Sequence, residues 1–151
     1  MTQPFTLQPL LDLTNSRLDR ATRELGRLIA NEQEGVRKLE LLQTYRDEYQ
    51  ARFHDALRDG IGVEALRNYS AFMARIDEAI EIQRAHLDQS QRHTAAGKQV
   101  WMAHRNKVKA FDTLHDRHVE RERRKDARDE QRLSDEHSAN RHRQREDAGD
   151  P

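Results

Sequence analysis

Two series of mostly apolar residues, each repeating every seven positions, lie on either side of a Gly60-Ile61-Gly62 turn. A repeat sustained over this many heptads predicts a left-handed coiled coil, because only a period of 3.5 residues keeps one helix face directed towards a partner. The first arm carries the series at heptad positions a and d: Leu11, Leu18, Leu25, Glu32, Leu39, Arg46 and Phe53, then Thr14, Ala21, Leu28, Gly35, Leu42, Tyr49 and Ala56. The second arm carries them at Leu66, Met73, Ile80, Leu87, Thr94, Trp101 and Val108, then Tyr69, Ile76, Gln83, Ser90, Gly97, His104 and Phe111. We call these positions the seam.

The two arms become complementary when the chain folds back on itself about Ile61. An a position of one arm then faces a d position of the other, in the pairs Leu11 with Phe111, Leu39 with Gln83, Phe53 with Tyr69, Leu42 with Ile80 and Tyr49 with Met73. Small residues face large ones in three further pairs: Ala21 with Trp101, Gly35 with Leu87 and Gly97 with Leu25. A glycine inside a helix costs about 1 kcal/mol relative to alanine, so the two seam glycines predict close approach of the helices, unless they are incidental.

Polar residues interrupt the seam near its middle. Glu32 is expected opposite Ser90, and Arg46 is expected beside Ile76. Polar seam residues weaken packing but select register, so we expect softer packing there.

The predicted fold is all-α, with two long helices in one antiparallel coiled-coil hairpin. We expect a single domain over residues 1–151, with a first helix over about 6–58, a turn over 59–63 and a second helix over about 64–138. Each arm would then hold about 50 paired residues, or roughly 75 Å of rod at 1.5 Å per residue. Beyond about His118 the second helix has no partner, so residues 117–147 form a charged overhang, and residues 139–151 are expected to be disordered.

Composition limits the class of protein. A hydrophobic content of 34%, a charged content of 36% and a mean hydropathy of -1.12 cannot supply a round core, although a thin core can suffice. Full-length disorder would also fit this composition but not the sustained periodicity. The 27 basic and 27 acidic residues cancel, so binding to nucleic acid or an acidic membrane would need a local patch of charge.

The sequence contains no cysteine, no signal sequence and no apolar run near 20 residues. We therefore expect a cytoplasmic protein.

No motif indicates catalysis, and we expect neither an enzyme nor a cofactor. Gly97-Lys98 lacks the flanking residues of a phosphate-binding loop. His115 and His118 are three residues apart, but two ligands make an incomplete zinc site. The basic run over residues 121–128 is interleaved with acids, which disfavours a nucleic-acid binder of the basic-helix kind.

Aromatic residues flank the seam at g positions, where charged residues are usual. Lys38, Tyr45, Phe72 and Ala79 fall on one side of the folded hairpin, and Leu10 and Leu114 lie on that side near the termini. Exposed Tyr45 and Phe72 would indicate a partner-binding surface. A slightly wider seam that buries both rings is the alternative, and periodicity alone does not separate the two.

Several of these features together resemble the FliJ family of flagellar type III export proteins. They are the leucines Leu11, Leu18, Leu25 and Leu28, the Tyr45 and Tyr49 pair, the stretch over residues 67–76 with Tyr69 and Phe72, and the charged tail. The resemblance covers nearly the whole chain. It implies a non-enzymatic antiparallel coiled coil, similar to the central stalk of rotary ATPases, that is peripheral at the inner face of the cell membrane through the export apparatus.

The resemblance also implies partners. The terminal end would sit in the pore of the hexameric export ATPase (FliI) and promote ring assembly, while the chain contacts the export gate protein (FlhA) and escorts export chaperones. The gate-binding surface of the family maps to Lys38, Leu42, Tyr45, Tyr49, Phe72, Ile76, Ala79 and Gln83. Lys38 and Gln83 depart from the usual glutamine and histidine, which puts the polar part of that contact in doubt.

Placement near the paired termini suggests which charges would face the ATPase. They are Arg17, Arg20, Arg23, Arg105, Lys107 and Lys109. The chain is expected to be monomeric when isolated, and a self-associating structural coiled coil is the alternative to the export component.

Overall fold

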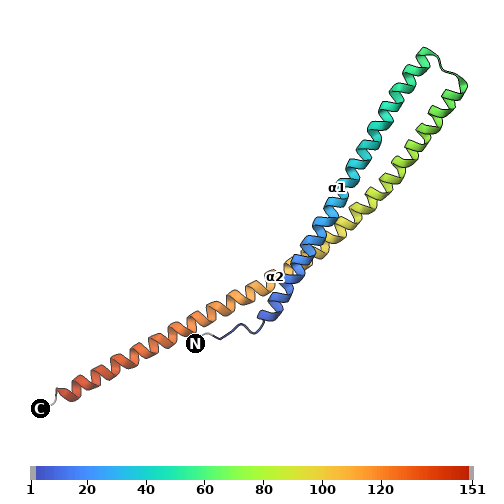
Figure 1. Cartoon of the computed structure of the whole chain (residues 1–151). Coiled ribbons are helices and arrows are strands. Elements are labelled where there is room, and N and C mark those ends of the chain that lie inside the picture. Colours follow the sequence, from blue (N-terminus) through green and yellow to red (C-terminus); the bar gives the residue numbers. More distant parts are fainter. Residues whose placement is uncertain (1–2, 150–151) are drawn as a thin grey trace. The chain divides into compact units, whose positions relative to one another are not determined.

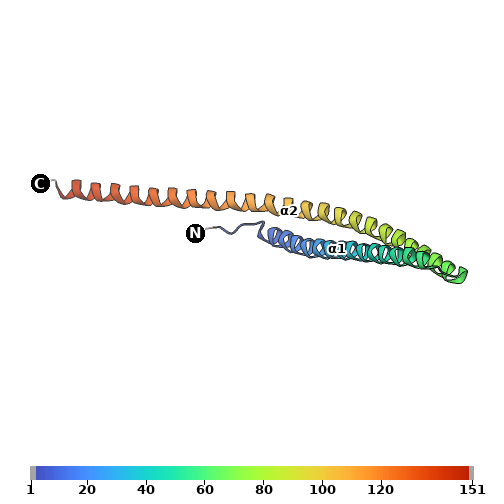
Figure 2. The ribbon, with the colours of Figure 1, turned by 90° about the horizontal axis from the view of Figure 1, so that it is seen from above.

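A computed structural model describes residues 3–149 of the chain. It contains two helices, α1 (Gln8–Asp59) and α2 (Val63–Ala148), and no strand within the described residues. α2 runs back along α1 after the turn, as both ribbon views show (Figures 1 and 2). The predicted all-α antiparallel hairpin is confirmed.

Gly60 and Gly62 determine where α1 ends and where α2 begins. Gly60 has a positive φ of 87° and donates its backbone N–H to the Leu57 carbonyl at 3.3 Å, which closes α1. A residue with a Cβ rarely adopts this conformation, whereas glycine adopts it readily. α2 then begins at Val63, and the Leu66 amide bonds to the Gly62 carbonyl at 3.0 Å. The turn therefore lies where the two heptad series predicted it.

The C-terminal end of α2 lies further along the chain than we predicted. The helix continues to Ala148, so the expected end near residue 138 and the expected disorder are wrong for residues 139–148. This segment lacks proline and contains three arginines, two alanines, one glutamine and one glutamate, which are good helix formers. His142 also pairs with Glu146 one turn later at 3.4 Å. Residues 150 and 151 of the predicted tail lie outside the described residues.

The described residues divide into two compact units where we expected one domain. The turn unit comprises residues 18–104, and the terminal unit comprises residues 3–17 and 105–149. In the turn unit α1 and α2 lie side by side up to the turn (Figure 1). In the terminal unit the start of α1 packs on α2, and the rest of α2 continues without a helical partner.

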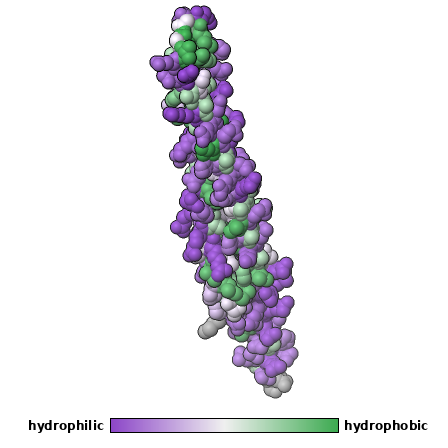
Figure 3. All heavy atoms as spheres, turned by 90° about the vertical axis from the view of Figure 1, so that its right-hand side faces the viewer, coloured by the Kyte–Doolittle hydropathy of each residue, from purple (hydrophilic) through white to green (hydrophobic). Residues whose placement is uncertain are grey.

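The seam positions are the least exposed residues of both helices. Every predicted seam residue of α1 is buried or half-buried, and so is every one of α2 except Leu66 beside the turn. The most buried side chains are Leu11, Thr14, Ile76, Ile80 and Val108, all of them seam residues. The view in Figure 3 is correspondingly hydrophilic over most of its surface, with separate hydrophobic patches. The thin core predicted from composition is thus a single strip between two helices.

The seam glycines mark close approach of the helices. A Cβ built on Gly97 would lie 2.6 Å from Leu28 Cδ1 and 3.7 Å from Leu25 Cδ1. One built on Gly35 would lie 3.4 Å from Leu87 Cδ1. Gly26, outside the seam, has nothing within 4 Å of that position. The seam glycines are therefore part of the packing and are not incidental.

Polar residues of the seam bond across the two helices of the turn unit. Gln83 Nε2 donates to the Gly35 carbonyl at 3.3 Å, and Trp101 Nε1 donates to Thr22 Oγ1 at 3.0 Å. Arg46 reaches out of the seam to an ion pair with Asp77 at 2.5 Å, which raises the pKa of its guanidinium. These contacts link the helices at fixed positions along the seam and so favour one register.

The glycine contacts predict different effects of the same substitution. Gly26→Ala should raise the free energy of unfolding by up to about 1 kcal/mol, because alanine is the better helix former and meets open space. Gly97→Ala should be less stable than Gly26→Ala by about 1 kcal/mol or more, because Leu28 must move. Urea denaturation followed by circular dichroism measures both, and equal stabilisation of the two variants would contradict close packing at Gly97.

Candidate partner-binding surface

The eight residues predicted to bind a partner lie on one side of the turn unit. Four occupy g positions and four occupy seam d positions; we call the set the flank surface: Lys38, Leu42, Tyr45, Tyr49, Phe72, Ile76, Ala79 and Gln83. In an antiparallel pair the g positions of both helices share one side of the seam. Two surface cavities confirm this sharing, since each is lined by residues of both helices on that side.

The turn-proximal end of the flank surface is aromatic. The rings of Tyr49 and Phe72 lie 4.2 Å apart between centroids at 31°, and Tyr49 also contacts Tyr69 at 5.9 Å. Tyr69 in turn contacts Phe53 at 5.5 Å. This ring cluster borders an open cavity of about 320 Å³ lined by Tyr49, Ala65, Asn68, Tyr69 and Phe72.

The exposure of the two flank aromatics settles a question that periodicity left open. Tyr45 is 51% exposed and Phe72 is 40% exposed, although Phe72 also packs on Tyr49. The alternative of a wider seam that buries both rings is therefore wrong. An exposed tyrosine and phenylalanine on one flank are typical anchors of a protein interface.

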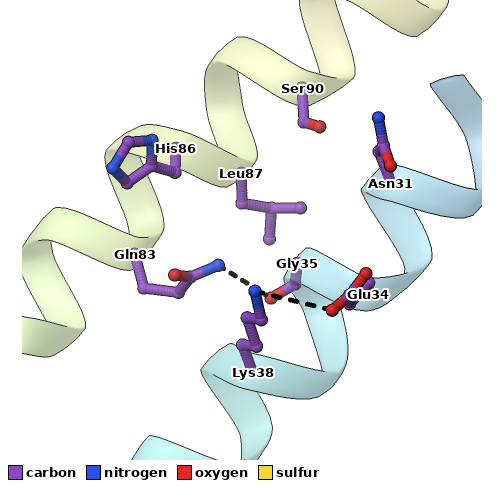
Figure 4. Close-up of a pocket in the computed structure, with 8 residues that line it drawn as sticks. All are labelled: Asn31, Glu34, Gly35, Lys38, Gln83, His86, Leu87 and Ser90. Atoms are coloured by element: carbon purple, nitrogen blue, oxygen red, sulfur yellow. Dashed lines mark hydrogen bonds and ion pairs between the residues drawn. The ribbon is translucent and has the colours of Figure 1, made fainter.

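The other end of the flank surface is polar and hollow. Asn31, Glu34, Gly35, Lys38, Gln83, His86, Leu87 and Ser90 line an open cavity of about 400 Å³ (Figure 4). Gly35 has no side chain, so the Gln83 amide reaches its carbonyl across the cavity, and Lys38 Nζ lies 3.5 Å from Glu34 Oε1. The two residues that depart from the family pattern, Lys38 and Gln83, are thus both engaged within this chain.

Not every residue of the flank surface can touch a partner. Ile76 is only 8% exposed and belongs to the core, while Leu42, Tyr49, Ala79 and Gln83 are half-buried. Lys38, Tyr45 and Phe72 are the exposed members. Four of the five less exposed members, Leu42, Tyr49, Ile76 and Gln83, also form the seam, and Tyr49 packs on the exposed ring of Phe72.

Sequence reasoning missed two apolar residues beside this surface. Leu41 is 52% exposed and Ile82 is 53% exposed. Both occupy heptad position c, which adjoins g on the same side of each helix. Position c is usually polar in a coiled coil, so an apolar residue there was the signal that identifies them.

The six charges predicted to face the ATPase are exposed but do not form one cluster. Arg17, Arg105, Lys107 and Lys109 belong to the terminal unit, and Arg20 and Arg23 belong to the turn unit. Within the terminal unit Arg17 and Lys107 occupy g positions, Arg105 occupies an e position and Lys109 a b position. These four charges therefore point to different sides of the seam.

The histidine pair of the terminal unit packs on an aromatic ring. Phe5 lies 5.3 Å from the His115 ring and 5.5 Å from the His118 ring between centroids. His118 Nε2 also lies 2.9 Å from the Gln3 carbonyl oxygen. Over residues 3–149 there is no group of three or more histidine, cysteine, aspartate or glutamate residues arranged to hold a metal ion. Within the same residues no helix is long and apolar enough to cross a membrane.

Comparison with known proteins identifies the family. The family model described as "Flagellar FliJ protein" matches residues 3–147. The chain belongs to the FliJ family. Curated relatives include the flagellar FliJ protein of Salmonella typhi, 29% identical over 117 residues, and that of Escherichia coli (strain K12), 26% identical over 117 residues. Each match covers 78% of this chain and 80% of the relative.

A solved structure shares the fold. It is described as a putative YscO homolog, CT670 from Chlamydia trachomatis, with a TM-score of 0.66 and 16% sequence identity. The alignment covers 96% of this chain and 98% of that one. Membership of the FliJ family makes this chain a component of the flagellar type III export apparatus, in a family of non-enzymatic export components.

Burial separates the structural from the exposed members of the flank surface. Ile76→Ala should lower the free energy of unfolding by about 2 to 4 kcal/mol, because it opens a cavity in the seam. Tyr45→Ala should change it by less than about 0.5 kcal/mol, since the ring is half in solvent. Urea denaturation of the two variants tests the assignment, and a larger loss for Tyr45→Ala would show that this ring belongs to the core.

Proposed function

We propose that this chain is a coiled-coil stalk of the flagellar export apparatus. In this role it binds the export ATPase ring and promotes ring assembly, contacts the export gate and escorts export chaperones at the inner face of the cell membrane. The family assignment supports the setting. The observation that carries the gate contact is the exposure of Tyr45 and Phe72 on one flank of the turn unit.

The flank surface suits a protein partner for three reasons. The Phe72 ring is held by Tyr49 of the seam, so little side-chain freedom of Phe72 is lost on binding. Leu41 and Ile82 widen the apolar area to both helices. The cavities beside Phe72 and Gln83 are open to a partner side chain. Apolar anchors with polar surroundings are the usual composition of a transient interface.

The gate contact predicts a loss of binding without a loss of folding. Tyr45→Ala combined with Phe72→Ala should weaken binding to the cytoplasmic part of the gate protein by at least about tenfold, because two aromatic anchors are removed. The matched control is Val36→Ala with Leu57→Ala, two exposed apolar residues at e positions on the other side of the seam. Titration calorimetry measures the affinities, and circular dichroism confirms the helix content. Equal binding by both double variants would refute the gate-binding role of the flank surface.

The ATPase contact is tested separately at the predicted charges. Reversal of Arg17, Arg20 and Arg23 to glutamate should reduce stimulation of the flagellar ATPase, and added salt should reduce it in the parent chain, because the contact is electrostatic. Reversal of Arg52, Arg67 and Arg75 near the turn is the control with the same change of charge. Hydrolysis and ring formation are the readouts. Unchanged stimulation by the first variant would contradict the assignment.

A further inference from the structure

The charged run of α2 in the terminal unit is sorted by helix face. From residue 107 to residue 130 the sequence mixes bases and acids, but the heptad frame separates them. No acid occupies a g or c position in this run. The acids lie at a, b, e and f positions: Asp112, Asp116, Glu120, Glu122, Asp126, Asp129 and Glu130.

The basic residues at g and c positions of this run, together with Arg17 of α1, form a basic stripe. Its members are Arg17 of α1 and Lys107, Arg117, Arg121, Arg124 and Arg128 of α2. All six side chains are exposed. At 1.5 Å per residue, the stripe runs for about 30 Å along α2. The stripe is a local basic patch in a chain whose overall net charge is zero.

Few of these bases are neutralised by neighbours. Among the stripe residues, all of which lie within the described range 3–149, only Arg124 forms an ion pair, with Glu120 at 3.2 Å. Glu120 is held more closely by Arg123, a b-position residue outside the stripe, at 2.7 Å. Hydrogen bonds from Arg123 and then Arg124 lower the pKa of the Glu120 carboxyl to about 2. Most of the stripe thus presents unneutralised positive charge to solvent.

The N-terminal segment packs on α2 away from the stripe. The N-terminal segment lies over the seam side, where Phe5 contacts His115 and His118. The Gln3 backbone N–H donates to Glu122 Oε2 at 3.4 Å. These contacts leave the stripe uncovered and occupy part of the acidic side.

Leucines accompany the stripe where α1 and α2 pair. Leu10 and Leu114 occupy g positions and Leu13 occupies a c position, with exposures of 47%, 39% and 45%. Arg17 and Lys107 lie on the same flank. Exposed leucines beside arginines on one helical face are typical of surfaces that rest in the headgroup region of a membrane.

We propose that the basic stripe binds the anionic surface of a lipid bilayer. Four to eight basic residues on one amphipathic face are characteristic of binding to acidic lipids. The positive charge of the stripe lies on one side of α2. A bilayer surface also contacts only one side of a helix, so the acids on the other sides would stay away from the lipid headgroups. A duplex groove encloses a helix on both flanks and would bring the acids of α2 against phosphates. The proposal does not depend on any export partner, because the chain alone supplies the surface.

Sedimentation with vesicles tests this proposal on the full chain. The vesicles contain phosphatidylcholine with about 30% phosphatidylglycerol, or phosphatidylcholine alone. The parent chain should bind the anionic vesicles and be released by salt. Arg117→Glu with Arg121→Glu and Arg128→Glu should lower the partition coefficient by at least about tenfold. The matched control, Arg141→Glu with Arg143→Glu and Arg145→Glu, makes the same change of charge further along α2 and should bind within about twofold of the parent.

A third variant separates charge from folding. Arg117→Lys with Arg121→Lys and Arg128→Lys keeps the charge and should keep the binding, and circular dichroism compares the helix content of all variants. The proposal is overturned if the parent does not bind anionic vesicles, binds neutral ones equally well, or loses binding equally in the control variant. Stripe-dependent binding to RNA or to duplex DNA without binding to vesicles would also overturn it.

Discussion

The burial of one narrow strip of side chains between α1 and α2 holds the rest of the structure in place. The most buried residues, Leu11, Ile76, Ile80 and Val108, all lie in this strip, and polar residues share it. Because so little apolar surface is buried per residue, the packing of each pair of facing seam residues matters more for stability than it would in a round core. Gly97 against Leu28 and Gly35 against Leu87 show that fit, because each glycine makes room for the leucine opposite.

A core this thin leaves most of both helices available for partners. In the turn unit the half-buried seam residue Tyr49 packs on the ring of Phe72, which stays 40% exposed, and Tyr45 is 51% exposed on the same flank. In the terminal unit the N-terminal segment occupies one side of α2 and leaves the basic stripe open. Each unit therefore presents a different kind of surface, apolar and aromatic in one and cationic in the other. This division fits the proposal that the two units bind different partners.

The sequence predicted the seam well because burial in a coiled coil follows the period directly. Twenty-eight heptad positions were named, and Leu66 beside the turn is the one that stays exposed. The solvent exposure of the flank residues Tyr45 and Phe72 was not predictable from the period. A g position is separated from the seam by only a small rotation about the helix axis, so a slightly wider seam would bury it. The end of α2 was missed because local pairs such as His142 with Glu146 sustain a helix that buries nothing. The basic stripe was missed because its charges were read along the sequence, where the acids interleave, and not around the helix.

The register of the seam is tested most directly by disulfide formation, since the chain has no cysteine of its own. Leu42→Cys with Ile80→Cys places the two thiols at facing positions, whereas Leu42→Cys with Leu87→Cys shifts the second by one heptad. Oxidation of the dilute proteins, followed by non-reducing electrophoresis and mass measurement, counts the bridges formed. The account predicts a rapid bridge within one molecule for the first pair and none for the second. Efficient bridging of the shifted pair, or bridges formed only between molecules, would contradict the hairpin.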